Sequence, residues 1–188
     1  MSSPLRVAVI GAGAFGGWTA LYLQRARAQV TLIDAWGPGN TRASSGGETR
    51  VIRTIYGPAR KYVEMAARAL TLWREWNRTA GQQYYVRTGV LWLTGTDDSY
   101  VRQSLGVLRE LAVDYEELQT IVAAKRWPQN NFDGVKSIHF EREGGYLLAR
   151  DACDAVAPEV VRTGGTYRQA AVVTVKAEGR RPEVGLSD

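Results

Sequence analysis

The spacing of apolar and polar residues predicts alternating strands and helices at the start of this chain. Residues 5–10 form a short, largely β-branched apolar run that is typical of a buried parallel strand. A glycine-rich turn over 11–16 leads into a helical stretch that continues to about Arg27. A second apolar strand over 29–33 ends on Asp34. This order predicts a parallel βαβ unit that carries an acid at the end of its second strand.

The rest of the chain predicts further helices and strands. Apolar residues at helical spacing predict a long helix over 59–79, whose aromatic stripe is core packing. The later predicted elements are a strand over 88–94, a helix over 101–112, a helix that ends at Trp127-Pro128, strands over 137–140 and 146–148 paired around a turn at 143–145, a helix over 151–162, strands within 166–177, and a hairpin turn at Arg180-Arg181-Pro182 followed by one more strand. Residues 86–148 therefore read as an α+β insertion into the first domain.

Each glycine of the turn has a distinct physical role. Gly11 permits the tight turn, Gly13 lets a pyrophosphate approach the backbone, and Gly16 lets the helix pack closely on the sheet. The helix N-terminus offers N–H groups and a positive dipole end to phosphates. Asp34 stands where a carboxylate accepts both ribose hydroxyls of an adenosine, and it disfavours a 2′-phosphate. The motif predicts a bound dinucleotide but leaves FAD and NAD open.

Composition excludes several other classes of protein. The chain has 188 residues, a formal charge of +5, 45% hydrophobic and 23% charged residues, which is ordinary for a soluble globular protein. Its cations are interleaved with acids, so we expect no nucleic-acid partner. The uncharged stretch from Val7 to Leu23 contains four glycines, which argues against a membrane span and favours a cytoplasmic protein. One histidine and one cysteine predict no metal site and no disulfide.

A long loop follows the second strand. Residues 36–50 are too rich in Gly, Ser and Asn to be helical throughout, and ordered loops of this length are uncommon unless functional. Small residues suit close wrapping of a large planar cofactor, whereas a simple NAD-dependent dehydrogenase continues promptly into helix and strand. Arg50 and Arg53, three residues apart, open a short helical or extended turn that ends at 56–58.

The sequence resembles the flavin-dependent amine oxidases of the D-amino-acid-oxidase superfamily, most closely their monomeric sarcosine oxidase and N-methyltryptophan oxidase branch. The resemblance covers essentially the whole chain, and its most specific part is the stretch Gly47-Glu48-Thr49-Arg50-Val51-Ile52-Arg53. The other matching segments are the glycine turn over 11–16, Asp34, 44–46, 62–63, Trp73, 88–91, 126–128 and 144–147. It implies FAD as the cofactor.

The resemblance also implies roles for individual residues. Arg50 lies against the flavin ring, where a cation stabilises the negative charge of the reduced ring. Arg53 holds the substrate carboxylate through paired hydrogen bonds that lysine cannot copy. The backbone near Val172 touches the adenine side of FAD. The implied FAD-contacting residues are Gly11, Ala12, Gly13, Phe15, Gly16, Ile33, Asp34, Ala35, Ser44, Ser45, Gly46, Thr49, Arg50 and Val172.

The implied fold is a Rossmann-like FAD-binding domain over 1–85 and 149–188, with part of an inserted α+β substrate domain over 86–148. The implied reaction oxidises the C–N bond of a secondary or N-methyl amino acid, with O2 as acceptor and H2O2 as product. Family members are about twice this length. We therefore expect an N-terminal fragment that lacks part of the pocket, the cysteine that attaches flavin and the lysine that activates oxygen.

Two alternatives remain at this stage, an NAD-dependent dehydrogenase and a non-catalytic dinucleotide-binding fragment. The two residues best suited to nucleophilic chemistry have no evident activating partner in the sequence. Cys153, in a helical stretch, is expected to be buried and structural. His139 is expected to be a surface or structural histidine.

Overall fold

A computed structural model describes residues 4–177 and 182–187 of the chain, so Arg180 and Arg181 of the predicted hairpin turn lie outside the described residues. The chain divides into two compact units. Unit 1 comprises Met1–Arg50 and Leu148–Asp188, and unit 2 comprises Val51–Leu147. The chain thus leaves unit 1 after the long loop and returns to it at the start of the 149–162 helix.

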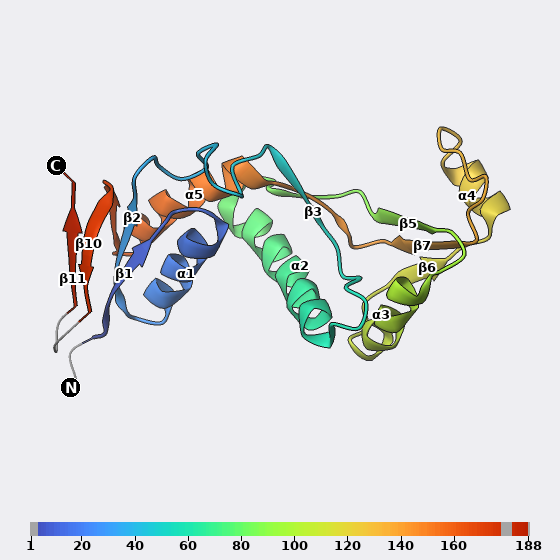
Figure 1. Cartoon of the computed structure of the whole chain (residues 1–188), viewed down its shortest axis with the longest axis horizontal. Helices are drawn as coiled ribbons and strands as arrows, with labels where there is room; N and C mark the ends of the chain where they lie inside the picture. The colour runs from blue at the N-terminus through green and yellow to red at the C-terminus, as the bar shows by residue number, and fades with distance from the viewer. Residues whose placement is uncertain (1–3, 178–181, 188) are drawn as a thin grey trace. The chain divides into compact units, whose positions relative to one another are not determined.

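Unit 1 is built on a parallel three-stranded sheet of order β1-β2-β9, which confirms the predicted α/β fold. Strand β1 (Arg6–Ile10) pairs in register with β2 (Gln29–Asp34), and β2 pairs with β9 (Thr166–Gln169). Figure 1 shows α1 (Ala14–Arg25) beside β1 and β2, which it connects. The acid at the end of β2 therefore lies at the same sheet edge as the glycine turn that follows β1.

Two helices pack against each other in unit 1. Helix α1 packs against α5 (Ala149–Arg162), and α5 also contacts β9. Their contact is close because Gly17 of α1 faces Val156 of α5, whose Cγ1 lies 3.2 Å from the position of an added Cβ. Beyond β9 the chain forms an antiparallel hairpin of β10 (Val172–Lys176) and β11 (Glu183–Leu186).

Unit 2 contains two three-stranded sheets and three helices. One sheet has the order β3-β8-β4 and the other the order β5-β7-β6. The elements are β3 (Thr49–Ile52), α2 (Arg60–Ala80), β4 (Tyr85–Arg87), β5 (Val90–Thr94), α3 (Ser99–Glu110), β6 (Tyr115–Glu117), α4 (Thr120–Arg126), β7 (Ser137–Glu141) and β8 (Gly145–Leu148). Strand β3 begins and β8 ends in unit 1, because the unit boundaries fall after Arg50 and before Leu148. Helices α2 and α3 pack on each other around a core that includes Ile55, Val63 and Leu108.

The prediction that the strands over 137–140 and 146–148 pair with each other is wrong. Strand β7 pairs with β5 and β6, whereas β8 pairs with β4. The intervening glycines explain the difference. A Cβ on Gly145 would lie 2.1 Å from the carbonyl oxygen of Val86, so this glycine permits β4 to approach. The Gly89 N–H also donates to the Gly144 carbonyl at 2.9 Å, so the glycines after β7 lie against the connection between β4 and β5.

Unit 2 begins at Val51, whereas the predicted insertion begins at residue 86. Helix α2 belongs to unit 2, although the sequence grouped it with the first 85 residues. The second boundary, between Leu147 and Leu148, lies next to the predicted one. No helix in the described ranges is long and apolar enough to cross a membrane.

Candidate functional site

The glycine turn of unit 1 has the close approaches expected of a nucleotide-binding turn. A Cβ on Gly16 would lie 1.8 Å from the Gly11 carbonyl oxygen, so only glycine fits there. Gly11 itself has φ of +100°, in the region that favours glycine. At Gly13 an added Cβ would have Ser45 Oγ as its nearest neighbour, at 3.0 Å. The backbone of the turn is therefore closely packed at Gly16, and the Ser45 hydroxyl lies beside Gly13.

The N-terminus of α1 suits a phosphate. Its first turn carries no acidic residue, and its N-cap is Gly13, which has no side chain to cap the helix. The Ala14 N–H donates to Ser45 Oγ at 3.1 Å, which joins the long loop to the helix end. Free N–H groups and the helix dipole attract anions at such a position. The end of α1 thus fits a pyrophosphate, with Ser45 beside it.

Asp34 is fixed by the backbone around it. Its Oδ2 accepts the Ala12 N–H at 2.8 Å and its Oδ1 accepts the Trp36 N–H at 2.8 Å. The Gly11 N–H in turn donates to the Ile33 carbonyl at 2.7 Å, so β2 and the glycine turn are locked together. A carboxylate has about four acceptor sites. Asp34 therefore retains acceptor capacity on both oxygens, as two ribose hydroxyls require.

The long loop is ordered by a residue that the sequence did not single out. The Asn40 side chain donates to the Gly37 carbonyl at 2.6 Å, and its Oδ1 accepts the N–H groups of Arg42 and Ala43. An asparagine in a turn commonly makes such bonds to its own backbone. Further along, Arg150 of α5 donates to the Gly46 carbonyl at 3.2 Å. These bonds hold the Ser44–Gly46 backbone beside the end of α1.

Arg50 belongs to unit 1 and folds back onto the loop. Its Nη2 donates to the Ser44 carbonyl at 2.5 Å and its Nη1 to the Thr49 carbonyl at 2.8 Å. Gly47 makes room for this arrangement, because a Cβ there would lie 2.4 Å from Arg50 Nη1. The guanidinium is thus held beside the loop residues that the sequence assigned to cofactor binding.

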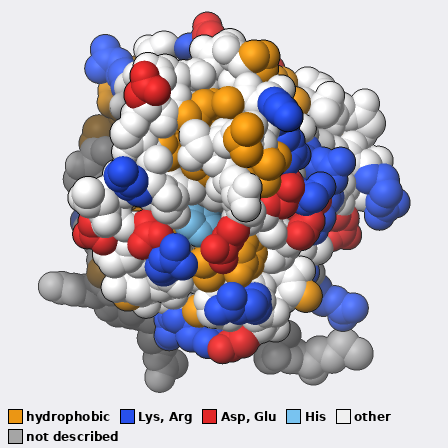
Figure 2. Space-filling view, turned by 90° about the vertical axis from the view of Figure 1, so that its right-hand side faces the viewer, with side chains coloured by type: hydrophobic (Ala, Val, Ile, Leu, Met, Phe, Trp, Pro, Cys, Tyr) orange, Lys and Arg blue, Asp and Glu red, His pale blue; other side chains and the backbone are white. Residues whose placement is uncertain are grey.

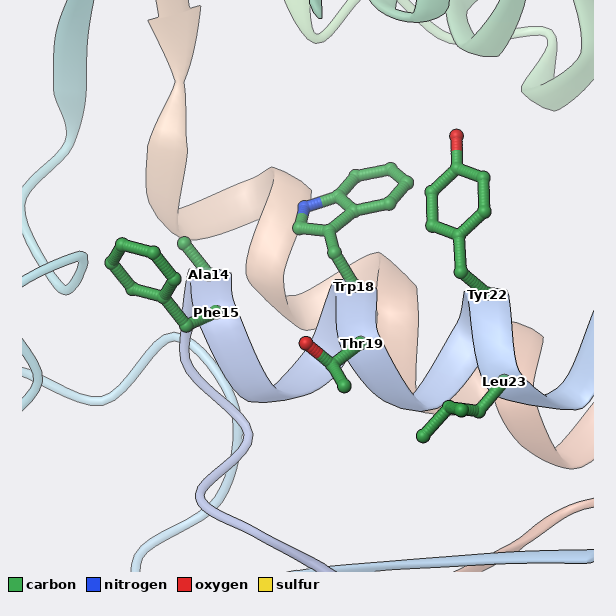
Figure 3. A pocket seen from close by; sticks show the side chains of 6 residues that line it. All are labelled: Ala14, Phe15, Trp18, Thr19, Tyr22 and Leu23. Carbon is green, nitrogen blue, oxygen red and sulfur yellow. The ribbon is translucent and has the colours of Figure 1, made fainter. Parts of the chain in front are cut away.

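An apolar surface continues from the glycine turn along α1. Phe15 is 92% exposed, an unusual state for a large apolar side chain within a tight motif. Figure 3 shows Trp18 and Tyr22 projecting from the same side of α1 one turn apart, with Phe15 at the start of the helix. The ring centroids of Trp18 and Tyr22 are 6.5 Å apart. Phe15, which the resemblance assigned to cofactor contact, thus presents its ring outward from the helix end.

Arg53 belongs to unit 2 and lies against two aromatic rings. Its guanidinium carbon is 4.7 Å from the centroid of Tyr56 and 4.9 Å from that of Trp92. Its Nη1 also donates to the Ile55 carbonyl. Stacking on ring faces leaves the in-plane N–H groups of a guanidinium available, and these are the groups that bind carboxylates in pairs. The two ring contacts and the bond to Ile55 therefore fix the plane of the Arg53 guanidinium.

Most of the predicted cofactor residues come together in unit 1. The glycine turn, Asp34, Ser45 and Arg50 are linked by the contacts above. The Ala170 N–H donates to the backbone carbonyl of Asp34 at 3.0 Å. Strand β10 begins two residues after Ala170, at Val172, so its start lies near Asp34 in space. Arg53, which the resemblance assigned to the substrate and not to the cofactor, belongs to unit 2.

The lone cysteine and histidine are both buried, and the Cys153 side chain interacts with Ser45 of the long loop. Cys153 on α5 is buried as expected, and burial raises the pKa of its thiol, which disfavours the nucleophilic thiolate. His139 on β7 is 1% exposed, so the surface alternative is wrong. Burial also lowers its pKa, and its Nε2 has no hydrogen-bond partner among the described residues.

Charges on the surface pair locally. Figure 2 shows Lys and Arg side chains among Asp and Glu side chains on the face that it draws. In unit 2, Arg142 pairs with Asp114 at 3.0 Å and with Glu116 at 3.2 Å, and Arg126 pairs with Glu116 at 2.9 Å. Several cations of unit 2 are therefore paired with acids in local networks.

Comparison with known sequences identifies relatives. The chain is 31% identical over 150 residues to a monomeric sarcosine oxidase from Arthrobacter sp. (strain TE1826), a match that covers 79% of this chain and 39% of that protein. It is 32% identical over 143 residues to an N-methyl-L-tryptophan oxidase from Citrobacter koseri, covering 74% of this chain and 37% of the relative. The chain thus matches about two fifths of the length of these relatives.

Known structures share the fold. An L-proline dehydrogenase from P. horikoshii superposes with a TM-score of 0.79 at 19% identity, over 99% of this chain and 50% of that one. A glycine oxidase from Geobacillus kaustophilus gives a TM-score of 0.74 at 17% identity, over 97% of this chain and 52% of the other. The sequence profile of the DAO family, described as FAD dependent oxidoreductase, matches residues 6–187. This chain therefore belongs to the DAO family of FAD-dependent oxidoreductases.

Proposed function

We propose that unit 1 binds FAD through the glycine turn, Asp34 and the long loop. The proposal rests on how the helix end, Asp34 and the long loop are arranged around one another. The first turn of α1 contains no acidic residue, Asp34 is oriented by two backbone N–H groups, and Ser45 links the loop to the helix end. The pyrophosphate would lie at the helix end and the adenosine ribose at Asp34. Val172 would contact the adenine side.

We propose that the complete enzyme oxidises the C–N bond of a secondary or N-methyl amino acid. FAD, when bound, acts as the two-electron acceptor for this chemistry. The amine loses two electrons and two protons to become an imine, which water hydrolyses to a carbonyl compound and an amine. O2 takes up the two electrons and two protons and leaves as H2O2. Relatives named sarcosine oxidase and N-methyltryptophan oxidase support this substrate class.

In this proposal the two arginines have separate tasks. Arg50, held beside Ser44, would stabilise negative charge on the cofactor ring. Arg53, stacked between Tyr56 and Trp92, would bind the substrate carboxylate and orient the amine. The strands and helices over 86–148 would supply part of the substrate domain.

Arg53→Lys is expected to raise KM for the amino acid about tenfold in the complete enzyme, because the planar pair of donors is lost while the charge remains. FAD binding should not change, since Arg53 belongs to unit 2 and the proposed FAD contacts to unit 1. Steady-state kinetics and the flavin absorbance of the purified variant measure the two effects separately.

The matched control for this prediction is Arg109→Lys, on α3. Arg109 donates to the Tyr115 hydroxyl at the surface of unit 2 and has no role in the proposed site. It should leave KM unchanged. Unchanged KM in Arg53→Lys as well would refute the assignment of Arg53 as the carboxylate-binding residue, although FAD binding by unit 1 would stand.

A further inference from the structure

A buried carboxylate lies behind the turn that carries Arg53. Glu141, at the end of β7, is 1% exposed. Its Oε2 accepts the N–H of Thr54 and the hydroxyl of the same residue, both at 2.5 Å, and its Oε1 accepts the Ile55 N–H at 3.3 Å. Glu141 thus binds the two residues that directly follow Arg53, across 86 or more positions of sequence.

The same carboxylate also holds one of the rings against which Arg53 stacks. The indole Nε1 of Trp92 donates to Glu141 Oε1 at 2.5 Å. Trp92 presents its ring face to the Arg53 guanidinium at 4.9 Å. One side chain therefore fixes both the backbone that carries Arg53 and an aromatic surface that orients its guanidinium.

The remainder of the turn is held independently by α3. Ser104 is fully buried, accepts the Tyr56 N–H at 3.1 Å and donates to the Gly57 carbonyl at 3.0 Å. Ile55 packs in the core formed with α2 and α3. Because Ser104 and Ile55 anchor the turn without Glu141, loss of the carboxylate should loosen Arg53 without unfolding unit 2.

We propose that Glu141 is a positioning residue that sets the orientation of the Arg53 guanidinium for carboxylate binding. A carboxylate suits this position because all four groups that meet it are hydrogen-bond donors: two backbone N–H groups, a hydroxyl and an indole N–H. Buried polar groups need such partners, and a buried charge needs several. The proposal rests on the carboxylate-binding role proposed for Arg53.

Glu141→Gln tests the proposal with little change of shape. The amide offers one acceptor oxygen and places an NH2 donor where Glu141 now accepts, so at least one of the four donors loses its partner. Nuclear magnetic resonance of the 15N-labelled chain reports on the Trp92 indole N–H and the Arg53 Nε–H. We expect hydrogen exchange at both sites to accelerate about tenfold or more, from loss of charge-assisted hydrogen bonds.

Glu143→Gln is the matched control. Glu143 lies two residues away and pairs with Arg74 and Arg87 at the surface, at 2.7 and 2.9 Å. It should leave both signals unchanged. If Glu141→Gln also leaves the Arg53 and Trp92 signals unchanged while the chain is folded, Glu141 does not position Arg53 and the proposal is overturned.

A second variant covers the case in which Glu141→Gln fails to fold. Trp92→Phe retains an aromatic ring beside Arg53 but removes the indole donor to Glu141. The proposal expects faster exchange at Arg53 Nε–H with an unchanged circular dichroism spectrum. An unchanged Arg53 signal in a folded Trp92→Phe chain would contradict the link between Glu141, Trp92 and Arg53.

Titration with sodium acetate separates this proposal from the role of Arg53 itself. Acetate should shift the Arg53 Nε–H signal of the wild-type chain. The Glu141→Gln chain should need a several-fold higher acetate concentration for the same shift. Altered exchange without any response to acetate would support positioning by Glu141 and contradict carboxylate binding by Arg53. If the acetate titrations of the two chains have the same midpoint, the positioning role of Glu141 is contradicted.

Discussion

Gly16→Ala is expected to abolish FAD binding and to destabilise unit 1 by about 3 kcal/mol, at the upper end of what overpacking costs. The added Cβ would lie 1.8 Å from the Gly11 carbonyl oxygen, which belongs to the backbone of the glycine turn and cannot move independently. The turn and the end of α1 would have to separate. Since both form the proposed pyrophosphate site, binding and stability should fall together.

Urea unfolding followed by circular dichroism measures the stability, and the flavin fluorescence of an FAD titration measures the binding. Gly106→Ala, in α3, is the matched control, because an added Cβ there meets no atom within 4 Å. That variant should gain up to about 1 kcal/mol from the helix propensity of alanine. A Gly16→Ala chain that binds FAD like the wild type would contradict the described packing of the turn.

Asp34→Asn is expected to weaken FAD binding about a hundredfold. The two proposed hydrogen bonds from the ribose would lose a charged acceptor, and such bonds contribute about 1.5–3 kcal/mol each. Asparagine also has only one acceptor oxygen for the Ala12 and Trp36 N–H groups that Asp34 now accepts. The dissociation constant from an FAD titration measures this effect directly.

Asp133→Asn makes the same chemical change at an exposed position of unit 2 and should leave the dissociation constant unchanged. Thermal unfolding of Asp34→Asn distinguishes a local effect from a loss of fold, because the variant should unfold cooperatively within a few degrees of the wild type. An unchanged affinity in a folded Asp34→Asn chain would remove Asp34 from the cofactor site.

The nucleotide-binding part of the fold could be predicted from sequence because its signals are local. The strand, the glycine turn and Asp34 follow one another within about thirty residues, and each has its own steric or electrostatic requirement. The order β1-β2-β9 and the contact between Asp34 and the glycine turn agree with that prediction. The family match over residues 6–187 supports FAD over NAD as the cofactor.

Long-range relations were harder to predict. A short glycine turn predicts that the strands over 137–140 and 146–148 pair with each other, but β7 pairs with β5 and β6, and β8 pairs with β4. The role of Glu141 has no sequence signature at all, since an acid at a strand end is ordinary. Only the fold brings it to Thr54, Ile55 and Trp92.

The most direct test of the account is the visible absorbance spectrum of the purified chain, recorded before and after addition of FAD. The account predicts a saturable change of the flavin band that survives desalting and is not displaced by excess NAD. A folded chain that leaves the flavin spectrum unchanged, or one that binds NAD in preference to FAD, would contradict the claim that unit 1 forms an FAD site.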